Sequence, residues 1–254
     1  MKISPARMLQ GMRNFDRLPE IWRCKRHTRD WLRLSSSYVG LRVPLPFQVT
    51  LPSGSFEFLE PSDIATFWQV FYRGIYPVHP SDRFIVDAGA NIGAFSLFAL
   101  GAAPEARVVA IEPAPDTFQR LQSMLRVHQL ESRCTLHRAA LGEAEGETFI
   151  ELAPASQFRR TGTSGCPVPM RTLDNLISDN AIVDLLKMDV EGAEYAVFRS
   201  ISRDLLRRIR RIVMEFHPQA AAAEAIAPLE AAGFAVSHYQ DDGNGYGVVR
   251  LERH

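Results

Sequence analysis

The sequence predicts an α/β fold in which helices cover a doubly wound, mostly parallel sheet. From residue 81 to the C-terminus, apolar strand patterns alternate with helical patterns, which is typical of a parallel sheet covered on both faces. A glycine-bearing turn, DAGANIG, joins the first of these strands to an apolar helix. The chain has 254 residues, of which 46% are hydrophobic, so it can bury one sizeable core and carry a small additional segment.

The first segment before the core, residues 1–42, is expected to form a basic helical extension. Trp22, Trp31 and several leucines are interleaved there with arginine and lysine. This pattern fits a helix packed on the main domain, which is the preferred interpretation. It also fits peripheral contact with an anionic membrane surface.

The second segment, residues 43–80, is expected to form a hairpin and a helix. FQVTL and SFEFLE flank Pro52-Ser53-Gly54, a sequence typical of a hairpin turn. PSDIATFWQVFYRGIYP follows with apolar residues at helical spacing and with Ser62 near the expected N-cap.

The core domain is predicted to span residues 81–254. Its strands are, in chain order, FIVDAGA, ARVVAIEP, SRCTLHRAAL, DLLKMDV and RRIVMEFHP. Its helices are predicted after Gly93 and over DTFQRLQSMLRVHQL, TLDNLI and AAAAEAIAPLEAAG. Residues 156–169 fit an acceptor-binding loop and a plain connecting loop equally well. FAVSHYQ and YGVVRLER are expected to pair across residues 241–245 as an antiparallel hairpin at one edge of the sheet.

Composition excludes several classes of protein. Cys24, Cys134 and Cys166 show no CxxC spacing, so neither a disulfide framework nor a structural zinc site is expected. No apolar run near the N-terminus is long enough for a signal peptide or a membrane span, which predicts a cytoplasmic protein. The formal net charge is zero, whereas general nucleic-acid binders are usually strongly basic, so no nucleic-acid partner is expected.

The DAGANIG turn predicts a nucleotide cofactor. In open parallel sheets, ligands bind beyond the carboxyl ends of the strands, where this turn lies. Gly89 and Gly93 allow a tight bend and close approach to a ligand, and the helix that follows offers its N-terminal amides. Glu112 ends the second strand about 20 residues later, where an acidic side chain accepts hydrogen bonds from ribose hydroxyls.

Two features of the turn favour S-adenosylmethionine over a dinucleotide. Asn91 stands where the GxGxxG pattern needs its middle glycine for approach to a pyrophosphate. Asp87 would repel a phosphate but suits the amino group of an amino-acid-bearing nucleoside. A nicotinamide-dependent oxidoreductase remains an alternative, because Glu112 would serve its ribose equally well. A catalytically silent nucleotide-binding module that keeps the fold is a second alternative.

Several motifs occur in an order that resembles the FkbM-type methyltransferase family: VDAGANIGAFS, AIEPAPDTF, AALG, TLDNL, LLKMDVEGAEYAVF and VMEFHP. The resemblance covers most of residues 47–218. It implies a Rossmann-like class I methyltransferase fold, S-adenosylmethionine as methyl donor, and O-methylation of a hydroxyl on a sugar, a glycan or another natural product. The residues that match the family's cofactor positions are Asp87, Gly89, Asn91, Gly93 and Glu112. The residues that match its fourth-strand signature are Asp189, Glu191 and Glu194.

Methyl transfer to a hydroxyl needs alignment of the reactants and a base that removes the acceptor's proton. The carboxylates of MDVEGAE follow the fourth strand, where the positive end of the cofactor, a substrate hydroxyl or Lys187 would balance their charge. Asp189 is therefore expected both in the cofactor site and, with Glu191, among the catalytic residues. For Glu194, a solvated position on the first turn of the next helix is equally compatible.

The MEFHP motif supplies the other catalytic candidates. Strand alternation puts Glu215 and His217 on the same face, at the carboxyl end of the fifth strand. His217 is the preferred general base, because histidine titrates nearest the working pH. Together with Asp189 and Glu191, these residues could hold a divalent metal such as magnesium or manganese. The spacing lacks a dense ligand signature, so no metal ligand is predicted.

Overall fold

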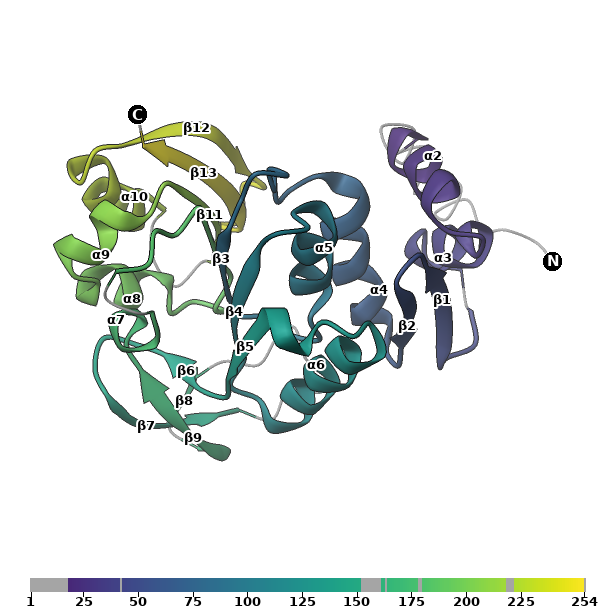
Figure 1. Cartoon of the computed structure of the whole chain (residues 1–254), viewed down its shortest axis with the longest axis horizontal. Helices are drawn as coiled ribbons and strands as arrows, with labels where there is room; N and C mark the ends of the chain where they lie inside the picture. The colour runs from purple at the N-terminus through teal and green to yellow at the C-terminus, as the bar shows by residue number, and fades with distance from the viewer. Residues whose placement is uncertain are drawn as a thin grey trace. The chain divides into compact units, whose positions relative to one another are not determined.

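The computed structural model describes residues 18–41, 43–151, 161–162, 164–177, 180–217 and 222–253. The chain divides into two compact units, with the boundary between Ile75 and Tyr76 (Figure 1). The division into three segments at residues 42 and 80, expected from the sequence, stays a prediction. In the described part of the chain, no helix is both long enough and apolar enough to cross a membrane.

The first unit combines helices with one hairpin. Its elements are α2 (Leu18–His27), α3 (Trp31–Tyr38), β1 (Phe47–Leu51), β2 (Gly54–Phe58), α4 (Pro61–Trp68) and the π-helical turn η2 (Gln69–Arg73). β1 and β2 pair antiparallel, as predicted, and Phe47, Val49 and Leu51 alternate with exposed residues along β1. The rings of Trp68 and Tyr72 are fully buried and meet edge to face, with centroids 5.0 Å apart. The unit therefore has an aromatic core of its own.

Helix α4 begins with a capping box. Glu60 is the N-cap and Pro61 takes the first helical position, so Ser62, expected near the cap, is the second helical residue. The Asp63 carboxylate accepts the backbone N–H of Glu60 at 3.0 Å, and Ser62 Oγ donates to Glu60 Oε2 at 3.1 Å. The α-helical geometry ends at Trp68, earlier than the sequence pattern indicated, because the chain continues as η2.

The second unit is built on a sheet in which, among the described residues, seven strands follow the order β12-β13-β11-β10-β3-β4-β5. These strands are β3 (Phe84–Ala88), β4 (Arg107–Ile111), β5 (Cys134–His137), β10 (Leu185–Met188), β11 (Arg211–Phe216), β12 (Phe234–Asp241) and β13 (Gly247–Arg253). β3, β4, β5, β10 and β11 run parallel, and β13 pairs antiparallel with β11 and β12. The predicted fold class, including the C-terminal hairpin, is confirmed. The strand order reverses between β3 and β10, which is where ligands bind in such sheets.

Helices cover this sheet. They are α5 (Ala94–Ala102), α6 (Pro115–Val127), the short 3₁₀ turn η3 (Glu131–Arg133), α7 (Leu173–Leu176), α8 (Glu194–Ser200), α9 (Arg203–Arg208) and α10 (Ala222–Ala231). Figure 1 shows α5 and α6 on the side of β4, and α8, α9 and α10 on the side of β11. Buried side chains of β10 and β11, including Met188 and Met214, pack with Phe198 and Leu229 of these last helices. A continuous apolar core therefore holds the strand ends of β10 and β11 in place.

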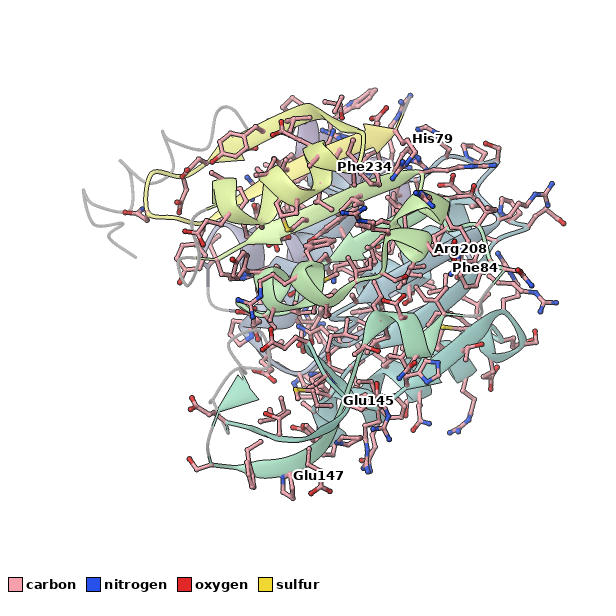
Figure 2. All side chains as sticks on the ribbon, turned by 90° about the vertical axis from the view of Figure 1, so that its left-hand side faces the viewer. His79, Phe84, Glu145, Glu147, Arg208 and Phe234 are labelled. Carbon is pink, nitrogen blue, oxygen red and sulfur yellow. The ribbon has the colours of Figure 1, made fainter. Side chains whose placement is uncertain are left out.

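A small second sheet was not expected from the sequence. Within the described residues its order is β6-β9-β7-β8, with β6 (Ala140–Leu141), β7 (Gly146–Ile150), β8 (Thr161–Gly162) and β9 (Cys166–Arg171). The third strand, predicted over SRCTLHRAAL, is shorter in the structure. β5 ends at His137, and the last two residues of that stretch form β6. Figure 2 shows Glu145 and Glu147 at this sheet, at the opposite end of the view from Phe234 of β12.

The loop expected at residues 156–169 is partly a strand. Residues 152–160 and 163 lie outside the described residues, and the loop prediction is wrong for the remainder, which contains β8 and the start of β9. The strand was not predicted because it contains Pro167 and Pro169, and proline has no backbone N–H to donate to a neighbouring strand. Both lie opposite β7 only, because β6 pairs with the last residues of β9.

Candidate active site

A cavity lies at the carboxyl ends of the strands that flank the point of reversal. Its lining comes from the turns after β3, β4 and β10 and from the small sheet. The residues that line it are Gly89, Asn91, Ile111, Glu112, Pro113, Ala139, Ala140, Leu141, Ile150, Asp189, Val190, Glu191 and Ala193. Of the predicted cofactor residues, the structure therefore brings Gly89, Asn91, Glu112 and Asp189 to one cavity.

The two glycines of the DAGANIG turn are required by close packing. Gly89 has φ +77°, and a Cβ added there would lie 1.7 Å from the carbonyl oxygen of Asp189. Gly93 has φ +87°, and its Cβ would meet Leu121 and Met124 of α6 at 2.6 and 2.3 Å. Gly93 does not line the cavity. Its role in the structure is to let α5 begin beneath α6.

Glu112 ties the end of β4 to the glycine turn. The side chain is 7% exposed, and its two oxygens accept the backbone N–H groups of Asn91 and Ala114, each at 2.9 Å. Burial raises the pKa of Glu112 to about 7. Each carboxylate oxygen can accept more than one hydrogen bond, so Glu112 can hold the turn and still receive a hydroxyl.

Asn91 supports the expectation of a ligand in this cavity. It has the left-handed φ of +49°, which asparagine tolerates better than most residues. Its Oδ1 is buried and has no hydrogen-bond partner among the described residues. A buried acceptor without a hydrogen-bond partner costs free energy. A ligand that donates a hydrogen bond to Asn91 Oδ1 would therefore fit this cavity. The Gly89 turn, Asn91 and Glu112 therefore fit a nucleoside.

Asp87 has a different environment from the one expected. It is fully buried and does not line the cavity. Ser96 Oγ donates to its Oδ2 at 2.6 Å, and its Oδ1 lies 3.2 Å from the ammonium of Lys187. The cation that Asp87 faces is therefore this chain's own lysine. A direct role of Asp87 in holding a cofactor stays a prediction.

Lys187 joins the turn after β3 to the end of β10. Its Nζ donates to the carbonyl of Gly89 at 2.6 Å and lies 3.6 Å from Asp189 Oδ2. Burial alone would lower the pKa of Lys187, but the carboxylates of Asp87, Asp189 and Glu215 outweigh it and raise the pKa to about 12. The sequence pattern indicated Lys187 only as one possible partner of the carboxylates of MDVEGAE. The signal it gave is a single charge within the otherwise apolar strand LLKM, all of which is buried.

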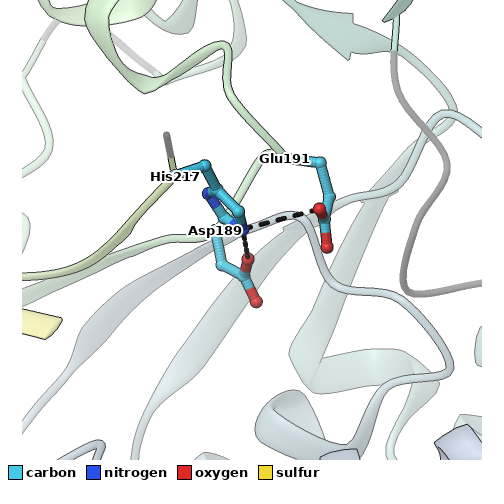
Figure 3. Close-up of side chains that lie close together, drawn as sticks. All are labelled: Asp189, Glu191 and His217. Carbon is cyan, nitrogen blue, oxygen red and sulfur yellow. Dashed lines mark ion pairs between the residues drawn. The ribbon is translucent and has the colours of Figure 1, made fainter. Parts of the chain in front are cut away.

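His217 follows β11 and is 7% exposed. Its Nδ1 lies 2.9 Å from Glu194 Oε1, and its Nε2 lies 3.5 Å from Glu191 Oε2 and 3.9 Å from Asp189 Oδ1 (Figure 3). Burial lowers the pKa of His217, but the three carboxylates outweigh it and raise the pKa to about 9. In the absence of a ligand, the imidazole is therefore protonated at neutral pH. This state was not expected, because a general base must be unprotonated to accept a proton.

Glu194 is the residue of this motif that sequence analysis described least well. It is 4% exposed rather than solvated. Besides contacting His217, its Oε1 accepts the backbone N–H groups of Val190 at 3.1 Å and Gly192 at 3.2 Å. Glu191 has a left-handed φ of +55°, and its Oε2 lies 3.5 Å from His217 Nε2. Glu194 thus fixes both the loop and the imidazole ring.

Glu215 lies on β11 beside this group, as the strand alternation predicted. Tyr76 donates a hydrogen bond from its hydroxyl to Glu215 Oε1, and the charge of His217 acts on Glu215. Burial, followed by the charge of Asp189, raises the pKa of Glu215 to about 7. Sequence analysis missed Tyr76, because nothing near it in the chain marks it as a partner of a residue on β11. Glu215 is not one of the residues whose ligand atoms gather closely enough for one metal ion; among the described residues, that group is Asp189, Glu191 and His217.

Comparison with known proteins relates the chain to one family. The family profile described as "Methyltransferase FkbM domain" matches residues 87–236, which include both the glycine turn and the His217 motif. A solved structure of Methyltransferase FkbM from Methylobacillus flagellatus KT superimposes with a TM-score of 0.53 and 17% sequence identity. The superposition covers 95% of this chain and 60% of that one. At this identity the likeness concerns the fold.

Three curated relatives are methyltransferases by name. Methyltransferase 1 of Beauveria bassiana is 29% identical over 204 residues, covering 68% of this chain and 82% of that protein. The 31-O-demethyl-FK506 methyltransferase FkbM of Streptomyces tacrolimicus is 27% identical, covering 62% of this chain and 74% of that protein. The hexuronic acid methyltransferase AglP of Haloferax volcanii is 24% identical, covering 74% and 80%.

Proposed function

This chain belongs to the FkbM methyltransferase family, and we propose that it transfers the methyl group of S-adenosylmethionine to a hydroxyl oxygen of a sugar, a glycan or another natural product. The observation that carries the proposal is the cavity in which Glu112, Asn91 and the Gly89 turn meet. Bound there, S-adenosylmethionine would supply a methyl group already activated on a sulfonium centre.

The donor side of the cavity has groups suited to the ribose and to the positive charge of that molecule. Glu112 would accept hydrogen bonds from the ribose hydroxyls, as acidic residues do at this position of nucleotide-binding sheets. The unpartnered Oδ1 of Asn91 would accept a further hydrogen bond from the donor. Asp189, whose side chain is 26% exposed, would face its positive charge. Lys187 holds the carbonyl of Gly89 and is itself paired with Asp87.

The acceptor side would be the group formed by Asp189, Glu191, Glu215 and His217. An acceptor oxygen near His217 Nε2 would lie beside the carboxylates that can receive or stabilise its proton. Glu194 orients the imidazole, because its Oε1 lies within hydrogen-bond distance of Nδ1. Because the pKa of His217 is about 9, the ring accepts a proton only after its own Nε2 proton has been displaced.

Two named relatives support the acceptor class. The name of the Streptomyces tacrolimicus protein refers to 31-O-demethyl-FK506, and that of the Haloferax volcanii protein to a hexuronic acid. Both names are consistent with an oxygen acceptor. We extend that class to this chain as part of the proposal.

Calorimetric titration with S-adenosylhomocysteine, the product of the donor, tests the donor site directly. We expect binding by the wild-type protein, at least tenfold weaker binding by Glu112→Ala, and unchanged binding by Glu147→Ala, whose exposed side chain lies on β7 away from the cavity. NAD and NADP serve as controls. Binding of a dinucleotide instead would favour the oxidoreductase alternative, and binding of none of the three would favour the silent module.

A further inference from the structure

Three side chains at the edge of the cavity point their ligand atoms at one another. Asp189, Glu191 and His217 each offer one such atom, and these atoms all lie within 4.8 Å of one another (Figure 3). We infer that these three side chains form a binding site for one divalent cation of the Mg²⁺ and Mn²⁺ class. The inference goes beyond the family match, which names no metal.

The separations are those that a small divalent ion can bridge. Ligand distances of about 2.1 Å limit two ligands of the same ion to a separation of about 4.2 Å. His217 Nε2 lies 3.5 Å from Glu191 Oε2 and 3.9 Å from Asp189 Oδ1, so both pairs already fall within that limit. Small rotations of the two partly exposed carboxylates would complete the coordination.

The buried imidazole distinguishes this group from an ordinary acidic cluster. More than nine-tenths of His217 is buried, and its Nε2 lies 3.5 Å from Glu191 Oε2 and 3.9 Å from Asp189 Oδ1. That nitrogen faces the gap between these two carboxylate oxygens (Figure 3). A divalent cation in the gap would bind the imidazole nitrogen together with both oxygens, a mixed ligand set that a cluster of carboxylates alone does not offer.

The ring is held in the orientation that such a ligand needs. Metal-binding histidines usually donate their second ring N–H to a carboxylate or a carbonyl, which fixes the ring and the tautomer. Glu194 Oε1 stands 2.9 Å from Nδ1 and is itself held by the backbone N–H groups of Val190 and Gly192. This arrangement leaves Nε2 as the atom that faces the carboxylates.

The composition of the group indicates which cation fits. Two carboxylate oxygens suit Mg²⁺ and Mn²⁺, and the imidazole adds affinity for Mn²⁺. Three protein ligands in an octahedral shell leave three positions for water or substrate. Because Asp189 and Glu191 line the cavity, those positions would open toward a bound acceptor.

The role of the cation rests on the proposed function, whereas its binding does not. A hydroxyl coordinated to a divalent cation loses its proton more readily than a free one. His217 would then act as a ligand through Nε2 rather than as the base.

Titration of the chelator-treated, full-length protein with Mn²⁺, followed by calorimetry and by the electron paramagnetic resonance signal of free Mn²⁺, tests the site. We expect one ion per chain, with binding at least tenfold weaker in Glu191→Gln and in His217→Ala. Glu147→Gln, which removes an exposed carboxylate on β7, is the matched control and leaves binding unchanged. Competition by Mg²⁺ places the ion in the proposed class.

Absence of binding at millimolar Mn²⁺, or binding that survives either Glu191→Gln or His217→Ala, would overturn the inference. The half-buried Glu191 keeps the test valid if the His217 variant does not fold. S-adenosylhomocysteine is titrated into the same protein without Mn²⁺. Nucleoside binding without Mn²⁺ binding overturns the cation site alone, and Mn²⁺ binding without nucleoside binding overturns the donor assignment alone.

Discussion

One cation of the first unit and two cations of the second unit lie in opposite settings. In the first unit, the guanidinium of Arg26 lies 3.9 Å from the ring centre of Trp22, which is itself 56% exposed. In the second unit, Lys187 and His217 are 4% and 7% exposed and are surrounded by carboxylates. A surface cation contributes little to stability and can meet a partner, whereas a buried cation is part of the fold's charge balance.

Removal of the buried ammonium would give the largest difference between the two settings. Lys187→Met leaves the fully buried Asp87 without its cation, and breaking a buried pair in this way costs about 3–5 kcal/mol. We expect the free energy of unfolding, measured by urea denaturation, to fall by about this amount.

Arg83→Met is the matched control for that variant. Arg83 also pairs with a carboxylate, Glu105, at 3.2 Å, but the two side chains are 66% and 72% exposed. Its loss is expected to cost less than about 1 kcal/mol. Equal effects of the two variants would contradict the contrast, because they would mean that Asp87 needs no buried counter-charge.

The exposed face of α2 provides the next largest expected effect, on binding rather than on stability. Trp22, Lys25 and Arg26 are exposed at helical spacing, and the acidic Glu20 is occupied by Trp68 Nε1 at 2.6 Å. The membrane interpretation, which ranked second to packing in the sequence, predicts that the protein co-sediments with vesicles that contain phosphatidylserine and not with pure phosphatidylcholine. Each basic residue near an anionic surface contributes about 1 kcal/mol.

Charge reversal tests that expectation. Lys25→Glu with Arg26→Glu is expected to abolish sedimentation with anionic vesicles and to change the melting temperature by only a few degrees. Arg107→Glu, which alters an exposed residue at the start of β4, is the control. Sedimentation that the double variant retains would favour the other sequence-based interpretation, in which this helix serves for packing.

The titration of Glu112 gives a smaller effect within the donor site. Its pKa of about 7 means that the carboxylate is mostly ionised at pH 8 and mostly protonated at pH 6. The ionised form accepts hydrogen bonds from the ribose better. The affinity for S-adenosylhomocysteine is therefore expected to fall about tenfold from pH 8 to pH 6. Calorimetry at both values measures it. In Glu112→Gln the dependence is expected to disappear, and its persistence would assign it to another group.

The smallest expected effect concerns the stability of the first unit. Arg26→Ala removes the contact with Trp22, and exposed cation–π contacts are worth about 0.5–1 kcal/mol. The melting temperature from differential scanning calorimetry should therefore change by only a few degrees. A loss comparable to that of Lys187→Met would show that the surface cation is structural after all.

The sequence predicted those features of the fold and site that depend on local patterns. Alternation of strands and helices identified the parallel sheet. The spacing in the sequence between the glycine turn and Glu112 predicted that this residue belongs to the cofactor site, and Glu112 lines the cavity. The small sheet escaped prediction because its strands are short and Pro167 and Pro169 interrupt the pattern of β9.

The unpredicted part of the site consists of pairings between distant positions. Glu194 meets His217, and Lys187 meets the carbonyl of Gly89, only because β3, β10 and β11 are neighbours in the sheet. The contact of Tyr76 with Glu215 joins positions that are further apart still. Residue type and spacing cannot specify such partners before the strand order is known. For the same reason, the rise in the pKa of His217 followed only from the carboxylates that the fold gathers around it.

Lys187 has a consequence for how two ligands would enter the protein. One ammonium group holds the carbonyl of Gly89 on the donor side and faces Asp189 on the acceptor side. A ligand that shifts either contact changes the energy of the other, so the two sites are expected to be thermodynamically linked. Such coupling is reciprocal: each ligand changes the affinity for the other by the same factor. The affinity for donor and for acceptor would then depend in part on a residue that neither of them touches.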